Sequence, residues 1–170
     1  MDKMPPTKEP AGENALRSAL RVELAQARAD FHHLLMAIPE HAWNEKAIGS
    51  AWRVREEMWH ITWGMAFMLT LIRNARRRIG LPKPPMMIAD RLNVLYSRLR
   101  AARATRRSIA RRYDRTHAAV LATLDTIRDD ELEFSVTVFS EAHTIAELFA
   151  GIRHHLEEHA ARVRPRLESE

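Results

Sequence analysis

The chain of 170 residues contains no cysteine. Disulfide bonds, thiolate metal ligands and a protein thiol nucleophile are therefore excluded, and the composition favours a reducing compartment. Long apolar runs are also missing: the longest, residues 58–72, is interrupted by His60 and Gly64 and is too short to span a bilayer. The first residues are polar and rich in proline, so we do not expect a signal peptide. These absences predict a cytoplasmic protein with no membrane partner.

Lysine is scarce as well, with 4 lysines against 23 arginines at a net charge of +5. This bias is more typical of genomic base composition than of a mechanism, and the excess charge is modest. Eight arginines lie within residues 98–115, where only Tyr96 and Tyr113 are aromatic. Nucleic-acid binding would call for interleaved exposed aromatic residues or a known module. We interpret this segment as a solvated helix face, and nucleic acid is a disfavoured partner.

Apolar residues recur every three to four positions in residues 14–38, 51–77, 86–127 and 144–163, which predicts amphipathic helices. The pattern weakens at 100–107, so 86–127 is either one bent helix or two helices, with Thr105 or Ser108 as a cap. Residues 133–139 alternate like a strand but have no evident partner, and we interpret them as an extended loop. The predicted fold is all-α: a four-helix bundle forming a single domain over residues 14–170, with an extra short or bent helix between helices two and three. Residues 1–13 are expected to be a flexible leader.

The last predicted helix begins with a capping box, Thr144 followed by Glu147. His155 and His159 lie on its apolar face, four residues apart and therefore side by side. His154 falls on the polar face. Histidine fills a core poorly because both ring nitrogens need partners when buried, so this pair calls for an explanation. The most specific explanation is that the two histidines bind one metal ion.

The second predicted helix carries a similar histidine, His60, in an apolar stripe between Trp59 and Trp63. If the two helices are neighbours, three imidazoles meet at the bundle axis, an arrangement typical of an open divalent metal site. Glu57 and His60 form an E-x-x-H pair, but a di-iron site needs a second such pair, which is absent. We therefore expect Glu56 or Glu57 to orient His60. We expect no functional role for His41, His117 or His143.

Trp52 followed by His60, together with the His155-x-x-x-His159 pair, resembles the DinB-like superfamily of four-helix bundles. The resemblance covers nearly the whole domain after residue 14. It implies a metal site formed by His60, His155 and His159. Its characterised members include metal-dependent transferases and isomerases that use low-molecular-weight thiols such as bacillithiol and mycothiol, and a hydrolase branch. The family usually has Ser or Thr directly after the tryptophan; here that position is Arg53, so we expect the helix cap to shift to Ser50.

Together, these observations predict a mononuclear metal-dependent enzyme, either a thiol-dependent S-transferase or isomerase or a hydrolase. The nucleophile would be a metal-bound water or thiolate, and the ion zinc, nickel or iron. We expect a small-molecule substrate, a low-molecular-weight thiol as co-substrate and a homodimer. The alternative is a non-catalytic metal-stabilised dimerising bundle, or a stress protein that binds nucleic acid through its arginines. The candidate substrate-binding residues are Arg53, Arg91, Arg98 and Trp63.

Overall fold

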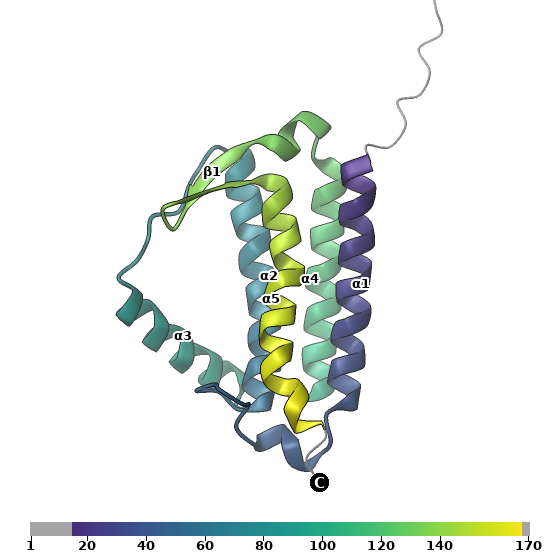
Figure 1. Cartoon of the computed structure of the whole chain (residues 1–170), viewed down its shortest axis with the longest axis vertical. Helices are drawn as coiled ribbons and strands as arrows, with labels where there is room; N and C mark the ends of the chain where they lie inside the picture. Colours follow the sequence, from purple (N-terminus) through teal and green to yellow (C-terminus); the bar gives the residue numbers. More distant parts are fainter. Residues whose placement is uncertain (1–14, 168–170) are drawn as a thin grey trace, which may run out of the picture.

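Four long helices form the body of the computed structural model, which describes residues 15–167 and, for residues 86–90, the backbone alone (Figure 1). They are α1 (Ala15–Ala37), α2 (Val54–Arg76), α4 (Arg106–Thr126) and α5 (Ile145–Val163). Both α1 and α2 pack against α4 and α5, which closes a four-helix ring. The predicted all-α bundle is therefore confirmed. The leader expected at 1–13 lies outside the described residues.

The core of the bundle is built from side chains of all four helices. Leu24 and Phe31 of α1, Met58 of α2, Tyr113 of α4 and Phe149 of α5 are each at most 1% exposed. The rings of Phe31 and Tyr113 stack with centroids 3.8 Å apart. Burial of each such side chain stabilises the fold by roughly 1.5–3 kcal/mol. This core holds α2 and α5 in fixed register, which matters for the site that they share.

The segment between α2 and α4 contains a separate helix, α3 (Met86–Ala101), so the choice between one bent helix and two is decided in favour of two. The Thr105 hydroxyl caps α4 by accepting from the Ser108 amide at 3.2 Å, and the Ser108 hydroxyl accepts from the Thr105 amide at 2.9 Å. Helix α3 packs mainly against α2 and lies obliquely beside the bundle (Figure 1). Three of its leucines, Leu92, Leu95 and Leu99, are 54–67% exposed.

The interpretation of residues 133–139 as an unpaired loop was wrong. Strand β1 (Ser135–Val138) pairs antiparallel with β2 (Glu141–Thr144), with Val138 opposite Glu141. The two-residue turn consists of Phe139 and Ser140, whose φ values are +53° and +79°. Such a turn usually carries glycine or asparagine, so this sequence gives no hairpin signal. The hairpin lies at one end of the bundle, beside α2 and α5 (Figure 1).

Three short 3₁₀ turns complete the chain: η1 (His41–Asn44), η2 (Asp129–Glu133) and η3 (Arg164–Arg166). Among the described helices, none has both the length and the apolar character needed to cross a bilayer.

Candidate metal centre

The start of α5 fixes which of its residues face α2. Thr144 accepts a hydrogen bond from the Glu147 amide at 3.1 Å, and the Glu147 carboxylate accepts from the Thr144 amide at 2.8 Å. This is the predicted capping box. From this start, His155 and His159 lie one turn apart, with ring centroids separated by 4.5 Å.

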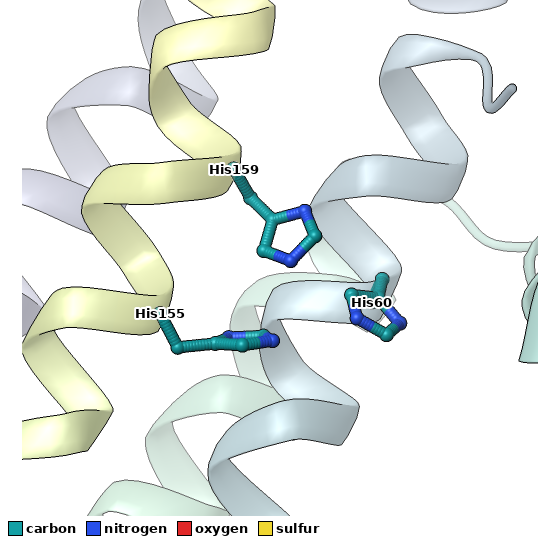
Figure 2. A group of neighbouring side chains, drawn as sticks. All are labelled: His60, His155 and His159. Atoms are coloured by element: carbon teal, nitrogen blue, oxygen red, sulfur yellow. The ribbon is translucent and has the colours of Figure 1, made fainter. Parts of the chain in front are cut away.

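His60 of α2 faces this pair. Its ring centroid lies 5.2 Å from that of His155 and 4.6 Å from that of His159. One nitrogen from each ring can be chosen so that all three lie within 4.8 Å of one another. His60 and His159 are buried and His155 is partly buried. Figure 2 shows the rings converging from two helices.

The orientation of the His159 ring is set by a buried carboxylate. Glu57, fully buried on α2, accepts a hydrogen bond from His159 Nδ1 at 2.6 Å. With the proton on Nδ1, the lone pair of Nε2 is free to bind an ion. The other oxygen of Glu57, Oε1, is buried without a hydrogen-bond partner among the described residues. A buried, incompletely satisfied carboxylate is costly, and a cation held by the adjacent imidazole would balance its charge.

The expectation that Glu56 or Glu57 orients His60 does not match these contacts. Nδ1 of His60 lies 3.3 Å from the hydroxyl of Ser97, a fully buried residue of α3. Glu57 instead contacts His159. The Glu56 carboxylate accepts from the Arg53 amide at 2.9 Å and so caps the start of α2.

The cap of α2 also differs from the expected one. Arg53 is the N-cap residue, with extended backbone angles, and Glu56 satisfies its amide. The hydroxyl of Ser50 accepts from the Trp52 amide at 3.0 Å, which stabilises the loop before the helix. The side chain of Glu56 thus makes one of the two bonds of a capping box, and Arg53, which has no hydroxyl, does not make the other.

A glycine makes room for the His155 ring. A Cβ atom at Gly64 of α2, one turn beyond His60, would lie 2.1 Å from Cε1 of His155. Carbon atoms in contact are normally 3.5–4.0 Å apart (about the sum of their radii). The His155 ring therefore lies directly on the α2 backbone, in a place that only glycine leaves open.

The surroundings of His60 and His155 lower the pKa of both imidazoles and so favour their neutral forms. Burial, with added repulsion from His159 and His155, lowers the pKa of His60 to about 2. Burial, followed by the charges of His159 and Arg162, lowers the pKa of His155 to about 3. Metal ions bind the neutral form of imidazole, so protons would compete weakly at these two rings.

The donor set fits a divalent ion. Ligands about 2.1 Å from a tetrahedral ion are about 3.4 Å apart, so modest side-chain movements would bring the three nitrogens to that spacing. In two of the rings, Nδ1 has a contact of its own: Glu57 contacts Nδ1 of His159, and Ser97 contacts Nδ1 of His60. Three imidazoles leave a fourth coordination position open, as in reactive metal sites.

Comparison with known proteins agrees with this arrangement. A family model described as the DinB superfamily matches residues 23–163. The chain belongs to the DinB superfamily. A crystal structure of an uncharacterized protein from Clostridium difficile 630 aligns with a TM-score of 0.70 at 10% identity, covering 90% of this chain and 96% of that one. At this identity the likeness establishes the fold alone. No curated protein matches the sequence.

In this DinB-superfamily bundle, the candidate substrate-binding arginines lie in different surroundings. Arg53 donates to the Asn44 carbonyl at 2.6 Å, and Arg98 donates to the Ala51 carbonyl at 2.8 Å, so both brace the loop before α2. Arg91 is exposed on α3. Trp63 is nearest to the centre, with its ring centroid 5.4 Å from that of His60.

Sequence reasoning missed several residues around the centre of this DinB-superfamily member. Arg162, three residues after His159, places Nη1 3.3 Å from His159 Nδ1 and pairs with Glu158. Trp52, used only as part of the motif, has its ring centroid 4.4 Å from that of His60. The i+3 spacing could have identified Arg162. Ser97 and Gly64 gave no signal, because their roles depend on how closely neighbouring helices approach.

The other histidines lie in different surroundings. His154 is exposed on α5. His117 is buried, and its Nε2 lies 3.0 Å from the Leu24 carbonyl, a contact within the core. His143 lies in the hairpin.

Two of the pockets formed by the described residues include residues of the centre or their neighbours. One, of about 470 Å³, lies between α2, α5 and the hairpin; its wall includes His155 itself, together with Phe67, Met68 and Phe139. The other, of about 530 Å³, lies between α2 and α3 and is lined mainly by apolar side chains, among them Trp63. A small molecule in the first pocket would contact the ring of a candidate ligand.

Proposed function

We propose that this protein is a mononuclear metal-dependent enzyme that acts on a small molecule, as a thiol-dependent transferase or isomerase or as a hydrolase. The observation that carries the proposal is the convergence of His60, His155 and His159 beside a pocket whose wall includes His155. A closed structural site would not need a neighbouring pocket of about 470 Å³, which is the size of many small-molecule sites.

His60, His155 and His159 would hold the ion, and Glu57 would fix the tautomer of His159. A divalent ion held by neutral imidazoles supplies Lewis-acid chemistry and lowers the pKa of a bound water or thiol. The protein has no thiol of its own, so a thiol substrate would be a separate small molecule.

The pocket beside His155 gives the substrate its surroundings. Phe67 and Met68 of α2 and Phe139 of the hairpin present apolar surface to this space. Apolar walls exclude water and favour a substrate with an apolar body. The rim carries His154 and Glu158, which are exposed and polar.

The test combines metal analysis with turnover. Purified protein is analysed for bound metal, then assayed with a panel of small thiols and electrophiles and with hydrolysable substrates, before and after metal removal. We expect turnover that is lost on removal and restored by one divalent ion. Turnover that does not change on metal removal, or a chain that binds no divalent ion, would overturn the proposal. The homodimer and the cytoplasmic location stay predictions.

A further inference from the structure

Another pocket, with a different character, lies where the end of α3 meets the start of α4. Its volume is about 460 Å³, and the ring of Trp59 from α2 forms part of its wall. Among the residues whose side chains the structure describes, no carboxylate lines it. The pocket is lined by five arginines: Arg100, Arg103, Arg111, Arg112 and Arg115. The segment interpreted from the sequence as a solvated face therefore gathers positive charge around a hollow.

Within the described part of the chain, these arginines do not form the ion pairs that arginines make elsewhere on the bundle. Arg76, for example, pairs with Glu131, and Arg153 pairs with Glu157. Within residues 15–85 and 91–167, no carboxylate lies within ion-pairing distance of any of the five pocket arginines. Like charges at close range repel one another. A bound anion would remove this repulsion.

One of the five is partly buried with an unused donor. The guanidinium carbon of Arg112 lies 5.3 Å from the ring centroid of Trp59, and its Nε is buried without a hydrogen-bond partner among the described residues. Trp59 is 4% exposed and packs edge-on against Tyr96. The wall behind Arg112 is therefore well packed. A buried N–H without a partner is costly unless a ligand accepts from it.

The start of α4 adds to the positive potential. The pocket wall includes Ser108, in the first turn of that helix. The amides of a helix N-terminus carry a partial positive charge. Planar guanidinium groups bind phosphate oxygens through paired hydrogen bonds.

We propose that this pocket binds a small anion that carries two or more phosphate groups. A single carboxylate would leave most of the five charges unbalanced, whereas a di- or triphosphate presents several anionic oxygens in a compact volume. Nucleic acid fits the pocket less well, because Trp59 is buried and cannot stack on bases. The site is separate from the three-histidine centre, and the proposal does not depend on the proposed enzymatic function.

The test measures binding of inorganic tripolyphosphate by calorimetry at low salt. The pocket variant is the double substitution Arg111→Gln and Arg115→Gln, which changes two exposed side chains and leaves the Trp59 contact intact. The matched control is Arg73→Gln with Arg77→Gln, which removes the same charge from exposed positions at the end of α2. Because polyphosphate also chelates metal, the metal content is measured before and after; chelation would affect both variants equally.

We expect the pocket variant to bind at least about tenfold more weakly than the wild type, since charge-assisted hydrogen bonds are lost. The control should change by less than about twofold, an effect of net charge alone. Arg112→Lys keeps the charge but loses Nε, and we expect weaker binding from it as well. Equal losses in the pocket and control variants, or no binding by the wild type, would overturn the proposal. The proposal would also be overturned if duplex DNA bound more tightly than tripolyphosphate and both double variants weakened the binding of DNA equally.

Discussion

The contact between Gly64 and His155 gives the sharpest test of the metal centre. Gly64→Ala adds one methyl group on α2, where it would lie 2.1 Å from Cε1 of His155. A normal carbon contact needs about 3.5 Å or more. The imidazole must therefore move by more than about 1 Å, or α2 and α5 must separate.

Two effects on stability oppose each other in this variant. Alanine in a helix is favoured over glycine by about 1 kcal/mol. An extra methyl group in a well-packed core typically destabilises the folded state by roughly 1–3 kcal/mol. The free energy of unfolding of the metal-free protein should therefore change by no more than about 2 kcal/mol. Metal binding should suffer more, because a displaced His155 leaves two ligands; disturbing even the support of a ligand costs roughly 10–100-fold in affinity.

The control is Gly151→Ala, on α5. Its added Cβ would lie 3.5 Å from Cε of Met68, an ordinary contact. It gains the same helix propensity without touching a histidine. Chelator competition should show at least about hundredfold weaker metal binding for Gly64→Ala and wild-type affinity for Gly151→Ala. Wild-type affinity in Gly64→Ala would refute the assignment of His155 as a ligand.

Three further predictions concern the same centre. His155→Ala and His159→Ala should each lose metal but keep the helical circular-dichroism signal, because alanine favours helix. Metal analysis checks this, with the exposed His154→Ala as the control. If His154→Ala loses metal and His155→Ala does not, the assigned rotation of α5 is wrong. Glu57→Gln should weaken metal binding roughly 10–100-fold in chelator competition, since it removes the charge next to His159; an unchanged affinity would contradict that role. The metal-free protein should lose stability as the pH falls from about 6.5 towards 3, because the unfolded chain takes up protons that His60 and His155, with their lowered pKa values, do not bind. Urea unfolding should show a slope of up to about 1.4 kcal/mol per pH unit for each of the two, and a stability that does not change with pH in this window would refute the burial argument.

Helical periodicity was sufficient to predict the helices of the bundle and the apolar faces that carry the histidines, whereas the meeting of His60 with His155 and His159 also required the two helices to be neighbours. His155 and His159 follow a capping box that determines where α5 begins, so their shared face could be read from spacing alone. His60 lies in an apolar stripe, and such a stripe faces the core whichever helix covers it. These features depend on residues near in sequence.

The contacts around the rings could not be predicted in the same way. Glu57 was expected beside His60 because the two are three residues apart on one helix. It contacts His159, 102 residues away in sequence, because the rotation of α2 relative to α5 decides which ring meets the carboxylate. The hairpin was missed for a local reason. Phe139 and Ser140 adopt left-handed backbone angles, which neither residue type favours, so the sequence does not indicate a turn there.

Helix α3 connects the two proposed sites. Through Ser97 it contacts His60, and its last turn supplies Arg100 to the arginine-lined pocket. The ring of Tyr96, also on α3, packs against Trp59, whose neighbour in sequence is His60. Helix α3 packs mainly against α2, and both Ser97 and the last residue of the helix, Ala101, are fully buried. A phosphate-bearing anion that draws Arg100 towards α4 would therefore act on the same helix that holds Ser97 against His60. Any coupling between anion binding and metal affinity should pass through this contact, and Ser97→Ala should abolish it while leaving tripolyphosphate binding unchanged.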